Sequence, residues 1–152
     1  MADDFAPKLV IGSPGGEHVS VQPTRREFPE TADYWDGNWV YADVGVRVGS
    51  FRGKYEALLR TDEFARFRTE LGPLYENLTG TACFESMEEW LKVRLTGDGK
   101  GHIEVACEAK DAPGVGNLLS FSLEIDQTEL PRILSEIDEI LRKFPVTGEP
   151  QA

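Results

Sequence analysis

The sequence predicts an α+β fold in which a mainly antiparallel β-sheet of about six to eight strands carries two amphipathic helices on one face. Several runs alternate apolar and polar residues, short Gly-rich turns join most of these runs, and two longer stretches have apolar residues at helical spacing. The chain has 152 residues, which is the usual length of one domain. We therefore expect a single domain over residues 1–152, with loose ends at residues 1–7 and 147–152.

The first half of the chain contains two hairpin patterns. Residues 8–12 and 18–22 are β-rich runs on either side of a Ser-Pro-Gly-Gly turn signal. Residues 39–48 and 51–59 alternate with a period of two on either side of a Gly-Ser pair, which predicts the second hairpin. Residues 22–33 contain two prolines and are expected to form an irregular connection between the hairpins.

The second half of the chain has further strand patterns. Residues 81–86 form a short β-rich run, and apolar residues alternate with polar ones over residues 90–95. An Asp-Gly-centred link at residues 97–101 joins the latter run to an alternating run over residues 102–108, which predicts a hairpin. Residues 119–126 alternate so regularly that we expect one dry and one solvated face of the sheet.

Two segments have the periodicity of amphipathic helices. The first begins at Thr61, a candidate N-cap, and Pro73 is expected to kink or divide it because proline removes a backbone donor. The second begins at Thr128 and is stopped by Pro145. Its apolar stripe consists of Leu130, Ile133, Leu134, Ile137, Ile140 and Leu141.

Net charge is the most distinctive bulk property of the chain. It contains 16 Lys and Arg against 27 Asp and Glu, which gives a net charge of −11. A field of this sign repels nucleic acids and anionic membranes and attracts basic proteins, so we expect neither of the first two as partners. Acidity alone is explained by solubility, and it indicates a basic partner only together with other evidence. The N-terminal residues lack a secretory pattern, which predicts a cytoplasmic protein.

No catalytic or metal-binding constellation can be assembled from the sequence. His18 and His102 are the two histidines, and neither pairs by pattern with a nucleophile. Cys83 and Cys107 lack zinc-ligand spacing and are expected to be two buried thiols. The Gly-rich residues 113–117 precede a strand and not a helix, unlike a phosphate-binding loop. We therefore expect a binding protein, not an enzyme, with no cofactor and no metal.

The segment Asp33–Trp39 places three large aromatic rings between acidic residues, just before a strand. In one interpretation Trp39 enters the core after a tight turn, and this interpretation is favoured for Trp39. In the other, aromatic rings and carboxylates form an interface patch, and for Tyr34 and Trp35 both interpretations stay open. Together with carboxylates on the next strand and at a later strand junction, the candidate partner-binding residues are Asp33, Tyr34, Trp35, Asp36, Asp43, Glu85, Glu88 and Glu89.

The octet Asp33-Tyr34-Trp35-Asp36-Gly37-Asn38-Trp39-Val40 resembles the signature of WapI-type immunity proteins, small bacterial proteins that neutralise contact-dependent toxins. Further similar segments follow in the same order, namely Glu89–Leu91, Gly101–Val105, Asn117–Phe121, Ile125–Thr128 and Phe144–Val146. The resemblance spans most of the chain. It implies a protein that binds a C-terminal toxin domain, commonly a nuclease, and blocks it without chemistry of its own.

A nuclease must tolerate phosphate, so the implied toxin is basic, and an acidic inhibitor would associate with it rapidly. This hypothesis predicts an acidic face on the helix-free side of the sheet. One alternative is a small-molecule-binding domain with a pocket between sheet and helices, lined by Cys83, Met87 and the Trp-rich segment. Another is a homodimer assembled through an edge strand.

Overall fold

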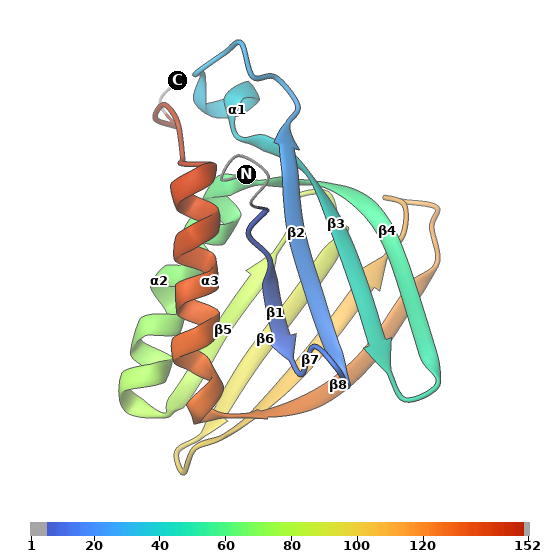
Figure 1. Cartoon of the computed structure of the whole chain (residues 1–152), viewed down its shortest axis with the longest axis vertical. Coiled ribbons are helices and arrows are strands. Elements are labelled where there is room, and N and C mark those ends of the chain that lie inside the picture. The colour runs from blue at the N-terminus through green and yellow to red at the C-terminus, as the bar shows by residue number, and fades with distance from the viewer. Residues whose placement is uncertain (1–5, 151–152) are drawn as a thin grey trace.

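The computed structural model describes residues 6–150 and shows an α+β protein made of antiparallel strands, as predicted. The strands divide into two four-stranded sheets, each with its strands in sequence order and antiparallel to their neighbours. The first sheet consists of β1 (Leu9–Gly12), β2 (His18–Arg26), β3 (Trp39–Val48) and β4 (Phe51–Arg60). The second consists of β5 (Thr79–Glu85), β6 (Leu91–Asp98), β7 (His102–Lys110) and β8 (Leu118–Asp126). The strands of the two sheets cross in Figure 1.

Two longer helices lie side by side along one flank of the sheets (Figure 1). They are α2 (Thr61–Asn77), which packs on β5, and α3 (Leu130–Lys143), which packs on β1. A single helical turn, α1 (Tyr34–Gly37), connects β2 to β3. None of the helices in the described part of the chain is long and apolar enough to span a bilayer.

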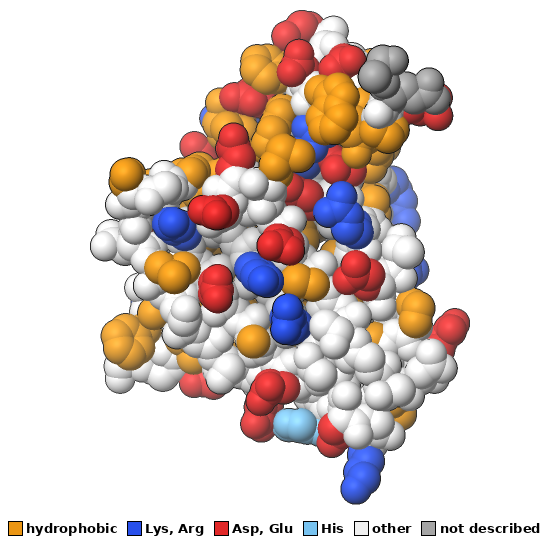
Figure 2. All heavy atoms as spheres, turned by 180° about the vertical axis from the view of Figure 1, so that it is seen from behind, with side chains coloured by type: hydrophobic (Ala, Val, Ile, Leu, Met, Phe, Trp, Pro, Cys, Tyr) orange, Lys and Arg blue, Asp and Glu red, His pale blue; other side chains and the backbone are white. Residues whose placement is uncertain are grey.

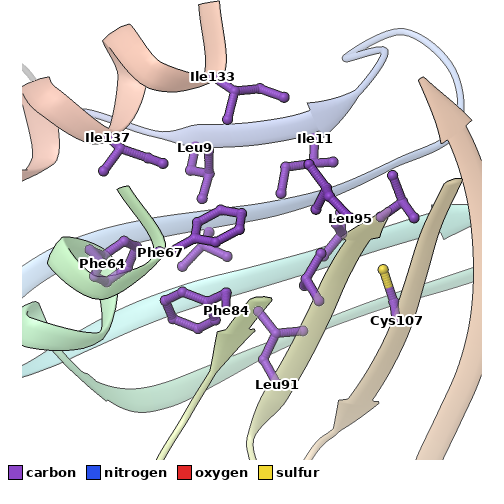
Figure 3. Packing of buried hydrophobic residues seen from close by; sticks show 14 of the residues in the cluster. Leu9, Ile11, Phe64, Phe67, Phe84, Leu91, Leu95, Cys107, Ile133 and Ile137 are labelled. Atoms are coloured by element: carbon purple, nitrogen blue, oxygen red, sulfur yellow. The ribbon is translucent and has the colours of Figure 1, made fainter. Parts of the chain in front are cut away.

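One cluster of buried hydrophobic side chains joins both sheets and both longer helices (Figure 3). Alternation along β3 and β7 sends every second side chain into this cluster. The helix α3 contributes Leu130, Ile133, Ile137 and Ile140, which recur at three- and four-residue spacing and are fully buried. Burial of each such side chain stabilises the fold by about 1.5–3 kcal/mol. The cluster fills the space between the sheets and helices.

Three local predictions were wrong in detail. The strand β2 runs on to Arg26, through a register shift next to Pro23, where an irregular connection was expected. Proline at a bulge costs little because the ladder is already interrupted there. The helix α2 is not divided at Pro73, because this residue lies near its C-terminal end and removes one hydrogen bond. Its N-cap is Arg60 and not Thr61.

The last helix also begins later than expected. Thr128 lies in a short 3₁₀ turn (Gln127–Glu129), and α3 starts at Leu130. Asp126 caps the 3₁₀ turn by accepting a hydrogen bond from the backbone N–H of Thr128 at 2.9 Å. Of the ends expected to be loose, residues 1–5 and 151–152 lie outside the described residues, whereas Pro7 is buried.

Candidate interaction surface

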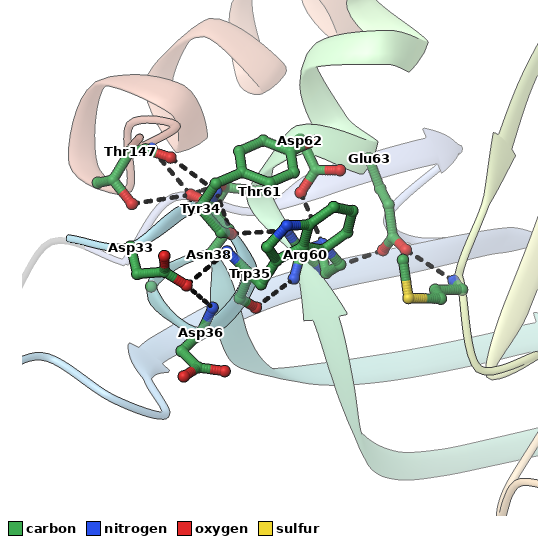
Figure 4. Close-up of polar contacts among 12 residues, drawn as sticks. Asp33, Tyr34, Trp35, Asp36, Asn38, Arg60, Thr61, Asp62, Glu63 and Thr147 are labelled. Atoms are coloured by element: carbon green, nitrogen blue, oxygen red, sulfur yellow. Dashed lines mark hydrogen bonds and ion pairs between the residues drawn. The ribbon is translucent and has the colours of Figure 1, made fainter. Parts of the chain in front are cut away.

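The guanidinium group of Arg60 lies at the centre of the region where α1, α2 and β4 meet (Figure 4). Arg60 is only 1% exposed. Its Nη1 and Nη2 donate to the carbonyl oxygens of Trp35 and Tyr34 at 2.7 and 2.8 Å, and its Nε donates to Asp62 at 2.9 Å. The rings of Tyr34, Trp35 and Trp39 lie 5.0 to 5.4 Å from the cation. The buried charge is therefore fully partnered, and it fixes α1 against β4.

The turn α1 forms because its first residues find local hydrogen-bond partners. The carboxylate of Asp33 accepts from the backbone N–H groups of Trp35 and Asp36 at 3.0 and 3.1 Å, which makes Asp33 the N-cap. Gly37 ends the turn in a narrow space, where an added Cβ would lie 2.8 Å from the hydroxyl of Thr147. The Asp33 carboxylate therefore shapes the turn, whereas the Asp36 side chain makes no hydrogen bond or ion pair within residues 6–150.

The buried side chain of Asn38 joins α1 to α2 and to the C-terminal segment. Its Nδ2 donates to the carbonyls of Tyr34 and Thr147 at 2.9 and 3.0 Å. Its Oδ1 accepts from the Thr61 hydroxyl and from the Thr147 backbone N–H, both at 2.9 Å. Arg26 adds bonds to the carbonyls of Gly37 and Pro145. Within the segment expected to be loose, Thr147 is thus held by specific hydrogen bonds.

Glu63 extends this network from α2 to the turn between β5 and β6. It is 4% exposed, and its two carboxylate oxygens accept from the backbone N–H groups of Arg60 at 2.9 Å and of Met87 at 2.6 Å. Burial raises the pKa of Glu63 to about 7, although both hydrogen bonds and the nearby guanidinium favour the charged form. Glu63 therefore ties the position of the β5–β6 turn to the start of α2.

These contacts assemble what we call the acidic rim. Its members are Asp33, Tyr34, Trp35, Asp36, Asp62, Glu85, Met87, Glu88 and Glu89. Two apolar side chains of the rim are well exposed, Trp35 at 50% and Met87 at 57%. Figure 2 shows acidic and hydrophobic side chains together at the upper end of the molecule, where Figure 1 places α1. The rim thus combines exposed large apolar groups with six carboxylates, of which Asp62 pairs with Arg60 and Glu89 with Lys110.

A shallow hollow of about 320 Å³ lies within the rim, between the start of α2 and the β5–β6 turn. Asp62, Glu63, Glu85 and Met87 line it together with Arg66. Carboxylates thus outnumber cations around the hollow. Such a surface favours positively charged side chains of a partner over anions.

Seven of the eight predicted partner-binding residues belong to this rim, and Asp43 does not. Asp43 lies in the middle of β3, on the outer face of the first sheet, opposite Gln22 and Glu56. The helix-free faces carry charges of both signs, as Figure 2 shows for the face below the rim. On the second sheet Lys92 faces Glu108. The prediction of an acidic helix-free face is therefore wrong, because the acidic side chains are spread along turns and strands alike.

The residues suggested for a small-molecule pocket do not line one hollow together, because the hollow at Met87 is lined neither by Cys83 nor by the Trp-rich segment. Met87 lies on the exposed β5–β6 turn, and Cys83 is partly exposed on the outer face of β5. Cys107 is buried on the inner face of β7 (Figure 3), so the two thiols lie on opposite faces of the second sheet and only one of them is buried. Within residues 6–150, no three or more His, Cys, Asp or Glu residues form a group that could hold a metal ion.

The sequence interpretation missed the residues that build the rim, namely Asn38, Arg60 and Glu63. Asn38 and Arg60 are ordinary polar residues at the ends of strand patterns, and nothing in the sequence indicates that they are buried. Glu63 lies two positions after the predicted cap Thr61, so it did not fit a capping box there, which needs an acidic residue at the third position. In the structure the cap is Arg60, and Glu63 completes a capping box with it.

The family model of the Immunity protein WapI-like family matches residues 10–145. The chain belongs to the WapI-like immunity protein family. The match includes the whole of α1 and both longer helices, so the rim of this family member lies inside the matched region. No curated protein matches the chain significantly in sequence.

Two solved structures resemble this WapI-like chain over most of its length. One is a chain from the Trypanosoma brucei MRP1/MRP2 structures, with 13% identity and a TM-score of 0.47, covering 91% of this chain and 84% of that one. The other comes from the CdiA-CT/CdiI toxin and immunity complex of Enterobacter cloacae, with 10% identity and a TM-score of 0.42, covering 89% and 99%. TM-scores below 0.5 do not establish a common fold, so the family assignment rests on the sequence match.

Proposed function

We propose that this WapI-like protein is a non-enzymatic immunity protein whose acidic rim binds and occludes a cognate toxin domain. Family membership supports the immunity role, and the geometry of the rim supports the place of binding. The observation that carries the proposal is the exposed Trp35, held among carboxylates on a base that Arg60 and Asn38 make rigid. A rigid aromatic anchor loses little conformational entropy on binding, which is what a tight interface requires.

The toxin domain that fits this surface is basic and nuclease-like. A nuclease binds phosphate groups with clustered cations, and the carboxylates of the rim would occupy the same cations. The net charge of −11 would steer the two proteins together and raise the association rate at low salt. In this proposal the toxin is blocked by occupation of its substrate site, in the cytoplasm, and the immunity protein catalyses no reaction.

Co-purification with the toxin encoded next to the gene tests this function. We expect a stable complex that inhibits the toxin and that associates more slowly as salt is raised. Trp35→Ala should weaken the complex by at least about thirtyfold, which is the usual effect of removing a hot-spot aromatic residue. The triple variant Asp36→Asn, Glu85→Gln, Glu88→Gln should mainly slow association.

A matched control separates the rim from net charge. The triple variant Glu76→Gln, Glu104→Gln, Glu124→Gln removes the same number of exposed carboxylates from α2, β7 and β8. We expect its association rate to stay much closer to that of the native protein. Equal effects of the two triple variants would argue against binding at the rim, and the absence of any complex at low salt would argue against the immunity function itself.

A homodimer through an edge strand stays a separate prediction. The strand β4 is an edge of the first sheet and begins with the exposed Phe51. Light scattering of the purified protein over a range of concentrations decides between monomer and dimer.

A further inference from the structure

The outer face of the first sheet has a second hollow, far along β3 from the rim, which we call the basic trough. Its volume is about 300 Å³. It is lined by four cations, Lys8, Arg47, Arg52 and Lys54, by Asp43, and by a floor that includes Ser20 and Gly45. Asp43 is the one carboxylate among these residues. A chain with many more acidic than basic residues therefore has a hollow whose charge is positive.

The floor of the trough contains the side chain of Ser20. Ser20 is 5% exposed, lines the trough, and makes no side-chain hydrogen bond to any residue from 6 to 150. Gly45, directly opposite on β3, leaves the space above it open, since a Cβ there would lie 2.8 Å from Ser20 Oγ. The Ser20 hydroxyl therefore faces the trough, where it can donate a hydrogen bond to a ligand.

The cations around this floor are also unpaired. Arg47 and Arg52 are directly opposite each other on β3 and β4, and Lys54 is opposite Gly45. Neither these three side chains nor Lys8 forms an ion pair or hydrogen bond with another described residue. Like charges directly opposite each other destabilise a sheet, and Asp43 is the one carboxylate of the lining against four cations. The arrangement has a cost to folding that a bound anion would remove.

We propose that the basic trough binds a small, multiply charged phosphate ligand, such as the pyrophosphate group of a nucleotide. A phosphate monoester carries about −1.5 to −2 charges at pH 7 and has several acceptor oxygens, which matches several cations and one hydroxyl donor. A carboxylate, with a single charge, would leave most of these donors unused. The volume is at the lower end of the range for small-molecule sites, about 300–1,000 Å³.

Titration calorimetry with inorganic pyrophosphate at low ionic strength tests this site on the intact protein, without any toxin. We expect the native protein to bind pyrophosphate. The double variant Arg47→Ala, Arg52→Ala should weaken binding by at least about tenfold, because it removes two cationic donors of charge-assisted hydrogen bonds. Ser20→Ala should weaken pyrophosphate binding less than the double variant does. Gly45→Ala should also weaken binding, because its methyl group would cover the Ser20 hydroxyl. Circular dichroism establishes that each variant is folded.

The double variant Lys92→Ala, Arg94→Ala is the matched control, because it removes two cations from another surface hollow, on the second sheet. We expect it to bind pyrophosphate as the native protein does. Equal weakening by both double variants would show general charge attraction and overturn the proposal. The proposal is also overturned if the native protein does not bind pyrophosphate, including the case in which it binds a single-stranded oligonucleotide instead.

Discussion

The backbone N–H of Arg60 donates a hydrogen bond of 2.9 Å to the carboxylate of Glu63, and both residues are buried. From this contact the network runs in two directions. The Arg60 guanidinium holds the carbonyls of α1, and the other Glu63 oxygen holds the β5–β6 turn through Met87. The two parts of the acidic rim are therefore coupled through one strand-to-helix junction. The packing of Arg60 and the protonation of Glu63 at this junction can both be tested by experiment.

Arg60→Met should destabilise the protein by about 3–5 kcal/mol. The substitution keeps an unbranched apolar stem but removes the donors to Tyr34, Trp35 and Asp62, and it leaves the Asp62 carboxylate without its cation. Arg60→Lys should recover part of the loss, because it keeps the charge without the planar fork. The free energy of unfolding from urea titration measures both effects.

The control for Arg60 is Arg66→Met, at an exposed position of α2, the helix that Arg60 caps. A change in unfolding free energy within about 0.5 kcal/mol is expected there. The interpretation of Arg60 as the centre of the rim fails if Arg60→Met costs no more than this control.

Stability should fall as pH rises from about 5 to 8, because of Glu63. Burial raises its pKa from 4.5 to about 7 in the folded protein, so the folded state binds more protons than the unfolded state between these values. The contribution of Glu63 to the free energy of unfolding is therefore fully present below pH 4.5. It is lost as pH rises through 7, where Glu63 of the folded protein ionises. The full difference is about 3 kcal/mol.

Glu63→Gln isolates this effect, because the amide does not titrate. The variant should lose the part of the pH dependence that Glu63 causes. Its stability should also be lower at every pH, because one of the two backbone N–H donors then faces the amide NH₂ group. Urea titrations of both proteins at several pH values measure the two slopes. Parallel slopes for the native protein and the variant would contradict the assignment to Glu63.

The thiols should react slowly and in a fixed order with a disulfide reagent at pH 8. Burial raises the pKa of Cys107 to about 12, and burial together with nearby Glu85 raises the pKa of Cys83. Because Cys83 is partly exposed and Cys107 is buried, Cys83 should react first. Cys83→Ser should remove the faster phase, and a denatured sample should react at both positions. Fast modification of Cys107 in the folded protein would contradict the packing shown here.

The elements of this fold were predictable where the local pattern is strong. The Asp98-Gly99 link predicted the β6–β7 hairpin correctly, because the turn residues and the alternation on either side both indicate a hairpin. The apolar stripe of α3 gave that helix for the same reason. The division of the strands into two sheets was not predictable, since alternation identifies the buried face of a strand but not the sheet that covers it.

The site was predictable only in part, because burial of polar residues is a tertiary property. The Asp33–Trp39 segment was recognised, and the structure places its aromatic rings around a cation from β4. Arg60 and Asn38 gave no local signal, since their partners are up to 109 residues away in the sequence, as in the bond between Asn38 and Thr147. The basic trough likewise depends on the register of β2, β3 and β4 and has no sequence motif.

Gly37→Ala should destabilise the protein by about 1–3 kcal/mol, because the added methyl group would lie 2.8 Å from the Thr147 hydroxyl and 2.9 Å from the Thr31 carbonyl. Gly72→Ala is the matched control, since nothing lies within 4 Å of its added Cβ and α2 would gain a better helix former. It should stabilise the protein by up to about 1 kcal/mol. Urea unfolding followed by tryptophan fluorescence measures both. If Gly37→Ala is as well tolerated as Gly72→Ala, then α1 is not packed tightly against the C-terminal segment, and the rim lacks the rigid base on which the proposed toxin binding depends.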